Sequence, residues 1–185
     1  MQSDTSTGNI RFGDYILIID SDTRVPKDCL LDAASEMELN PDVAILQHAS
    51  GVMNVTTRYV RSCFPRLRLL LTSSSSFFEK GITFFTNLVY SQIKYAVASG
   101  DVAPFVGHNA ILRWEAIQYI GYECPDDLRE KWWSEETVSE DFDMALRLQG
   151  AGYIVRLAGY VAPDGAKYDE GVSLTVYDEL ARWEK

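Results

Sequence analysis

The chain has 185 residues, of which 46% are hydrophobic and 12% aromatic, so it holds enough apolar material for a folded core and is not a disordered chain. Its formal net charge of −10 argues against a nucleic-acid-binding protein, because a phosphate backbone is held by clustered Lys and Arg. Three widely separated cysteines, Cys29, Cys63 and Cys124, favour neither a disulfide framework nor a zinc site.

The first predicted elements are a strand, a helix and a second strand. Residues 15–19 form a continuous apolar run that ends at Asp20, which is typical of a buried parallel strand. A helix is expected over residues 27–39, and residues 43–47 form a second short apolar run. This order predicts a right-handed parallel crossover.

The helix over residues 27–39 is predicted from apolar residues at helical spacing. Asn40 and Pro41 are expected to end it, since proline cannot continue a helix. The residues expected on its buried face are Leu30, Leu31, Ala34 and Met37.

A long helical pattern covers residues 58–98. Two interpretations remain open: a core helix laid over the sheet, or an interfacial or acceptor-channel helix, because aromatic residues are numerous for its length. The apolar residues that recur at threes and fours are Phe77, Phe78, Ile82, Phe85, Leu88, Val89, Ile93 and Val97.

The last third of the chain predicts a loop over residues 101–109, a short helix over residues 113–120 and a strand over residues 153–157. Between them, residues 137–140 match a capping box. A helix is therefore expected to run from there to about residue 149. No repeat or linker divides the sequence, so residues 1–185 are predicted to form a single domain.

Asp20 and Asp22 follow directly after the first predicted strand, where open α/β sheets bind ligands. Alternation along an extended backbone places both carboxylates on one side, which suits a hard cation such as Mg²⁺ or Mn²⁺ that also takes phosphate oxygens. An Asp-rich turn without a ligand is the alternative interpretation.

Two other sites that begin with such acids fit less well. An EF-hand loop starting at Asp20 needs Gly and Glu where Val25 and Leu31 stand. A haloacid-dehalogenase-like phosphatase needs Thr or Val where Arg24 stands, and Asp101 lacks the second acid expected beside it. The phosphatase-like hydrolase is kept as the alternative function.

Two further groups of residues can carry chemistry. Glu140 and Asp141 fall in the first turn of a predicted helix, where they either cap the helix or supply a general base. Arg182 and Trp183 can hold a diphosphate and a sugar, or can form part of an ordinary surface helix.

Taken in order, these residues resemble the family-2 glycosyltransferases, the group of the cellulose, chitin and hyaluronan synthases, and look closest to fungal cellulose-synthase-like members. The family carries DxD, then Thr/Ser-Glu-Asp, then Q-x-x-R-W. Residues 20–22, 139–141 and 179–183 match these motifs, and residues 105–109 resemble the segment beside the acceptor sugar. The resemblance implies a Rossmann-related, GT-A-like α/β fold, with a mixed sheet flanked by helices.

The resemblance also implies a donor site for a UDP-sugar with Mg²⁺ or Mn²⁺. Asp20 would contact the nucleotide, and Asp22 would bind the metal on the diphosphate. Arg182 and Trp183 would hold the diphosphate and the acceptor end of the cleft.

For the saccharide acceptor, Asp141 would be the base and Glu140 would support it, so that an inverting in-line transfer is expected. The residues implied to line the acceptor path are Gly107, His108, Asn109 and Glu179.

The match departs from the family pattern in three places. The family's first nucleotide-binding strand should precede Tyr15, so that part is expected to be truncated. A catalytically silent truncated fragment is therefore a second alternative, beside the phosphatase-like hydrolase. Glu179 stands where the family has Gln. The family continues beyond Trp183 into membrane helices, so the parent chain is expected at the cytosolic face of a membrane. No apolar run in the given sequence reaches the ~18 residues that a membrane-spanning helix needs.

Overall fold

The computed structural model describes residues 13–53, 74–134 and 139–184, with the side chains of residues 74–76 and of Trp183 left aside. Its main sheet has four strands in the order β1-β4-β2-β7. These are β1 (Tyr15–Ile18), β4 (Ala110–Arg113), β2 (Val43–His48) and β7 (Ile154–Ala158). β4 runs antiparallel to both of its neighbours, and β2 runs parallel to β7, so the sheet is mixed.

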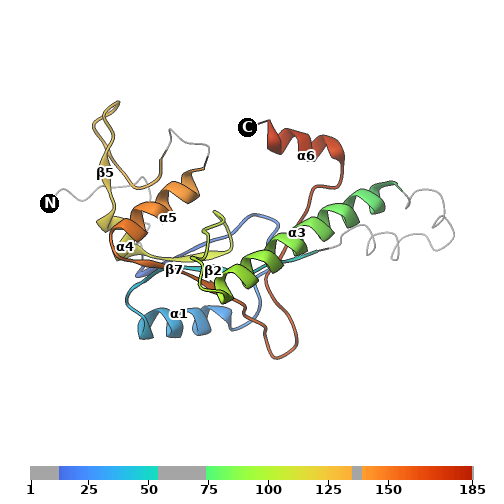
Figure 1. Cartoon of the computed structure of the whole chain (residues 1–185), viewed down its shortest axis with the longest axis horizontal. Helices are drawn as coiled ribbons and strands as arrows, with labels where there is room; N and C mark the ends of the chain where they lie inside the picture. The colour runs from blue at the N-terminus through green and yellow to red at the C-terminus, as the bar shows by residue number, and fades with distance from the viewer. Residues whose placement is uncertain (1–12, 54–73, 135–138, 185) are drawn as a thin grey trace.

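Helices flank this sheet, as Figure 1 shows. The helices are α1 (Cys29–Leu39), α3 (Ser74–Ala98), α4 (Trp114–Tyr119), α5 (Glu140–Gly150) and α6 (Val176–Trp183). There are also two small sheets. In the first, β3 (Gly51–Val52) pairs in parallel with β8 (Asp169–Glu170). In the second, β5 (Tyr122–Glu123) pairs antiparallel with β6 (Glu130–Lys131). The architecture confirms the predicted α/β fold of GT-A type.

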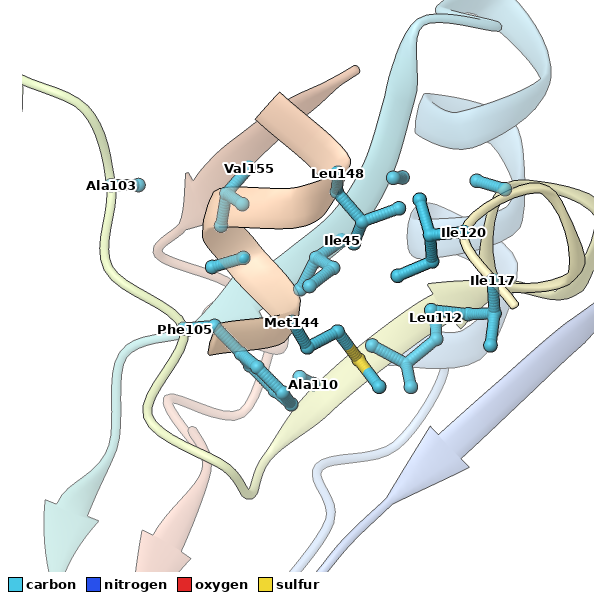
Figure 2. Packing of buried hydrophobic residues seen from close by; sticks show 13 residues of the cluster. Ile45, Ala103, Phe105, Ala110, Leu112, Ile117, Ile120, Met144, Leu148 and Val155 are labelled. Atoms are coloured by element: carbon cyan, nitrogen blue, oxygen red, sulfur yellow. The ribbon is translucent and has the colours of Figure 1, made fainter. Parts of the chain in front are cut away.

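The larger part of the core lies between the sheet and helices α4 and α5 (Figure 2). Ile45 and Leu112 of the sheet meet Met144 and Leu148 of α5, and all four are fully buried. A second, smaller cluster on α1 holds Ala33, Met37, Val43, Leu46 and Ile111. Neighbouring strand residues thus pack against opposite layers, as expected for a sheet covered on both faces.

The first strand is present, but the prediction that it is buried and parallel was wrong. β1 is an edge strand of the main sheet, it is antiparallel to β4, and its four residues are half-buried. β4 lies between β1 and β2, which therefore run in the same direction without pairing. The strands of the predicted crossover are thus parallel, but another strand separates them. An apolar run signals burial but does not specify the direction of the neighbouring strand.

The buried face of α1 was predicted correctly at Met37 but wrongly at Leu30 and Leu31. Cys29, Ala33 and Met37 are fully buried, whereas Leu31 is 73% exposed and Leu30 about half exposed. The small side chain of Ala33 lets the helix approach the sheet closely. Cys29 lies 3.3 Å from the hydroxyl of Tyr168, and the leucines beside it point to solvent. The predicted end of the helix at Asn40 is confirmed.

Helix α3 confirms the helical pattern over residues 74–98, and residues 58–73 lie outside the described residues. It is not a core helix, because Phe77 and Phe84 are 80% and 70% exposed. Among the described residues of α3, Tyr90 is the one large apolar side chain that is buried. Within the described ranges, none of the helices combines the length and apolar content that a bilayer crossing requires.

The remaining predicted elements are confirmed within a residue or two as α4, α5 and β7. Thr137 and Val138 of the predicted capping box lie outside the described residues. α5 starts after Ser139, whose side chain makes no capping hydrogen bond.

Candidate active site

A cavity of about 610 Å³ lies between the end of β1, helix α3, the segment after β8 and helix α6. Three of the predicted donor residues line it. Asp20 and Asp22 follow β1, whereas Arg182 belongs to α6. Its other lining residues are Ser21, Ile82, Phe85, Thr86, His108, Glu170, Gly171, Val172, Ser173, Leu174, Asp178 and Glu179.

The turn that carries Asp20 and Asp22 is fixed by backbone hydrogen bonds. The amide of Thr23 donates to the carbonyl of Asp20 at 3.1 Å, which closes the turn. The backbone of Arg24 then pairs with that of Asp169 in both directions, at 2.8 and 3.3 Å. This antiparallel bridge joins the first acidic motif to the strand that leads into the far wall of the cavity.

Because of that bridge, the carboxylate of Asp22 lies directly against Gly171. A Cβ at Gly171 would overlap with the carboxylate carbon and oxygen of Asp22. Glycine is therefore required here by close approach rather than by its backbone angles. The absence of a side chain at this position leaves room for Asp22 to face the cavity.

The loop over residues 105–109 is held to the sheet by the buried side chain of Gln47. Its amide nitrogen donates to the carbonyl of His108 at 2.9 Å, and its amide oxygen accepts from the backbone of Val106 at 2.9 Å. The amide of His48 also donates to the carbonyl of Asn109 at 2.9 Å. A polar side chain in a fully buried strand thus sets the shape of the predicted acceptor segment.

His108 forms part of the cavity wall, with about a fifth of its side chain exposed. Its Nε2 lies 2.8 Å from a carboxylate oxygen of Glu170, and its Nδ1 lies 3.1 Å from the carbonyl of Val106. Burial by itself lowers the pKa of His108, but the hydrogen bond and charge of Glu170 and the charge of Asp20 outweigh it, so the pKa is raised above its ordinary value.

Asn109 lies behind this wall and is fully buried. Its side-chain nitrogen donates to Ser50 at 2.7 Å and to Glu170 at 3.1 Å, and its oxygen accepts from Thr23 at 3.0 Å. Asn109 thus connects the acidic turn, β8 and the acceptor segment, while Gly107 and His108 precede it in the same loop.

Helix α6 presents Glu179 and Arg182 on one face, and both line the cavity. The helix begins with a capping box in which Thr175 and Asp178 exchange hydrogen bonds of 3.1 and 3.2 Å. The guanidinium of Arg182 lies 3.9 Å from the carboxylate of Glu179. Trp183 follows at the end of the helix.

Asp141 and Glu140 do not line this cavity. Asp141 is in the first turn of α5, where its carboxylate accepts the amide of Phe142 at 2.8 Å. A Cβ at Gly107 would lie 3.3 Å from the other oxygen of Asp141. The predicted base is thus adjacent to the acceptor segment at Gly107.

A divalent metal was predicted at Asp22. In the described ranges, no group of three or more His, Cys, Asp or Glu side chains gathers as a ready-made metal site. Mg²⁺, however, is usually held by one or two carboxylates and takes its other ligands from water and substrate phosphates. The two carboxylates on the cavity wall, next to open volume, fit this kind of partly protein-made site.

Sequence reasoning missed Glu170 and Gly171. They lie at and just after a two-residue strand, which is too short to show any periodicity, and no motif covers them. Their importance follows from the contacts with His108, Asn109 and Asp22 alone.

Comparison with known proteins finds similarity to enzymes that build glucans. The chain is 26% identical over 159 residues to the glucans biosynthesis glucosyltransferase H of Cereibacter sphaeroides, covering 85% of the chain and 23% of that protein. It is 27% identical over 164 residues to the protein of the same name from Rhodopseudomonas palustris, covering 82% and 20%. It is 27% identical over 176 residues to the protein of the same name from Xanthomonas campestris pv. campestris, covering 92% of the chain and 23% of that protein.

The chain therefore spans about a quarter or less of the length of these curated relatives. All three relatives are bacterial, and the predicted closeness to fungal members stays a prediction. The model of the glycosyl transferase family group 2 matches residues 15–67 and 65–185, which is nearly all of the chain. Together with the mixed α/β sheet and the order of its motifs, this match shows that the chain belongs to the glycosyl transferase family group 2.

Proposed function

We propose that this chain is the catalytic part of a metal-dependent, inverting glycosyltransferase that moves a sugar from a UDP-sugar to a saccharide acceptor during polysaccharide synthesis. The observation that carries the proposal is the cavity in which Asp20, Asp22 and Arg182 meet from opposite ends of the chain. The names of the relatives, all glucosyltransferases of glucan biosynthesis, support the sugar-transfer chemistry.

On the donor side, Asp20 contacts the nucleotide and Asp22 holds Mg²⁺ or Mn²⁺ against the diphosphate. When bound, the metal supplies positive charge that stabilises the leaving diphosphate. Arg182 adds charge-assisted hydrogen bonds to the same phosphates from α6. Trp183 is assigned to the acceptor end of the cleft from its sequence motif. The support for these roles is that Asp20, Asp22 and Arg182 all line the same cavity.

On the acceptor side, Asp141 takes the proton from the attacking hydroxyl, and Glu140 supports it at the start of α5. Gly107, His108 and Asn109 form the loop that lines the acceptor path, and Glu179 approaches the acceptor from α6. The ring of His108 also borders the cavity that holds Asp20 and Asp22. Contact between Asp141 and the loop at Gly107 supports this arrangement, because the base and the acceptor segment then share one boundary.

The experiment that tests the donor site is calorimetric titration of UDP into the purified chain, with and without Mn²⁺. Binding that requires Mn²⁺ and is lost in Asp22→Ala is the expected result. Asp126→Ala is the matched control, since Asp126 is an exposed acid that does not line the cavity. A folded chain that binds no UDP, or binds it equally well without Asp22, would contradict the proposal.

The phosphatase-like alternative has less support, because the family match favours a transferase. It makes a separate prediction, namely phosphate release from a phosphomonoester that depends on Asp20. Release of phosphate that Asp20→Asn abolishes, without any UDP binding, would favour the hydrolase.

We also propose that the parent protein works at the cytosolic face of a membrane. The exposed apolar side chains along α3, at Phe77, Phe84, Leu88 and Tyr95, support this location because they repeat on one side of the helix. A parent reading frame without any apolar stretch of about 20 residues would contradict it.

A further inference from the structure

One oxygen of the Glu170 carboxylate gathers three side chains from two other parts of the chain. His108 Nε2 lies 2.8 Å from this oxygen, Asn109 Nδ2 donates to it at 3.1 Å, and the hydroxyl of Tyr90 donates to it at 3.4 Å. Tyr90 belongs to α3, and the other two residues belong to the predicted acceptor segment. Glu170 therefore joins α3, β8 and the segment 105–109 at the cavity wall.

The surroundings of His108 favour one protonation state on geometry alone. Both ring nitrogens face hydrogen-bond acceptors, a carboxylate at Nε2 and a backbone carbonyl at Nδ1. Neutral imidazole has a single N–H and can satisfy only one of them, whereas imidazolium donates to both. The ionisable groups facing this ring are Glu170, Asp20 and the hydroxyl of Tyr90, which is bound to Glu170.

The cavity is lined by several acidic side chains, so a positive charge on His108 would favour the binding of an anion. Asp20, Asp22, Asp178 and Glu179 all line the space, and an anionic diphosphate would be repelled by them. An imidazolium at His108 adds a positive group to the wall that carries Asp20, in addition to Arg182 on α6.

We infer that Glu170 is a positioning residue that holds His108 as an imidazolium on the cavity wall, where it helps to accept the anionic part of the donor. The identity of that donor rests on the proposed function, but the contact between Glu170 and His108 does not. No assigned motif includes Glu170, and its effect on the donor is exerted through His108.

The test combines NMR of the histidine rings with nucleotide binding at pH 7. Because the chain has two histidines, ¹⁵N-labelled histidine gives two ring systems, and His48→Phe assigns them. Glu170→Gln keeps the size and an acceptor oxygen but removes the charge. Tyr90→Phe is the matched control, because it removes one hydrogen bond to Glu170 and leaves the carboxylate in place.

We expect both nitrogens of His108 to be protonated in the native chain and in Tyr90→Phe, and His108 to become neutral in Glu170→Gln. Affinity for UDP with Mn²⁺ should fall by about tenfold in Glu170→Gln, the order expected when a charge-assisted hydrogen bond is lost. Circular dichroism confirms that each variant is folded.

An unchanged His108 spectrum in folded Glu170→Gln would overturn the inference. So would a neutral His108 with unchanged UDP affinity, because the cation would then have no part in donor binding. If the native chain bound no UDP at all, the proposed donor site would fail, while the ring spectra would still decide whether Glu170 sets the state of His108.

Discussion

The two histidines of the chain lie in regions that are built in different ways. His48, at the end of β2, is fully buried, stacks on Tyr168 with 4.3 Å between ring centres, and has no hydrogen-bond partner for either ring nitrogen among the described residues. His108, at the cavity wall, has an acceptor at each nitrogen. Burial lowers the pKa of His48 to about 4, whereas the pKa of His108 is raised.

This difference extends to the regions themselves. The sheet and helices α1, α4 and α5 are held by apolar packing, with fully buried side chains such as Ile45, Leu112 and Leu148. The cavity is held by hydrogen bonds from Gln47, Asn109 and Glu170. Stability is therefore expected to depend mainly on the first region and ligand binding on the second.

The largest expected effect on stability comes from removing core volume on α5. Leu148→Ala should lower the free energy of unfolding by about 2–5 kcal/mol, because it leaves a cavity beside Ile45 and Met144. Leu146→Ala, on the same helix and 66% exposed, should change it by less than about 0.5 kcal/mol. Urea unfolding of both variants measures this, and equal losses would show that α5 does not pack as described.

Acid should destabilise the protein through His48. Because its folded-state pKa is about 4 and its ordinary value is 6.5, the unfolded chain takes up a proton first as the pH falls. Stability contributed by neutral His48 is thus present above pH 6.5 and lost progressively towards pH 4, by about 3 kcal/mol.

The control for that prediction is His48→Phe, which keeps a ring beside Tyr168 but cannot titrate. Urea unfolding at several pH values should show a smaller loss between pH 6.5 and 4 than in the native chain. His108 does not interfere in this window, since a raised pKa gives stability that is fully present below 6.5 and lost only at higher pH. Parallel losses in both proteins would refute the assignment to His48.

On the cavity side, Gly171→Ala should weaken UDP binding with Mn²⁺ by about tenfold or more, because the new Cβ displaces the carboxylate of Asp22. Unfolding in urea should change little by comparison. Gly159→Ala is the matched control, as a Cβ there meets no atom within 4 Å. Calorimetry of the two variants should separate them, and equal affinities would argue against Asp22 as a donor residue.

The smallest effect is expected from the ion pair between Arg156 and Glu36, which are 2.7 Å apart and partly exposed. Arg156→Gln should lower the free energy of unfolding by about 0.2–1 kcal/mol, and by less at high salt. The effect is small because salt screens exposed ion pairs and because ordering the two side chains costs entropy. A loss as large as that of Leu148→Ala would mean that charge, and not packing, holds α1 to the sheet.

Much of the core region could be predicted from the sequence. The run at residues 43–47 corresponds to fully buried β2, and the predicted helix at residue 140 corresponds to α5. β4 was not predicted, because three apolar residues and an arginine after a loop carry too little periodicity. The buried face of α1 was misplaced because hydrophobicity favours leucine, while close packing here uses Ala33 and Cys29.

For the cavity, the motifs predicted Asp20, Asp22 and Arg182 as site residues, and the three line the same space, while their roles stay predictions. The sequence could not identify Glu170 or Gln47. A single glutamate or glutamine has no pattern of its own, and its role depends on which distant groups the folded chain places around it.

The pairing of Arg24 with Asp169 has a consequence for how the protein is made. Asp169, the backbone partner that fixes the acidic turn, is synthesised well after the turn itself. Contacts between distant parts of a chain close slowly, and chains fold from the N-terminus during synthesis. The cavity should therefore be completed only after residues 169–182 have been synthesised, well after its first acidic turn.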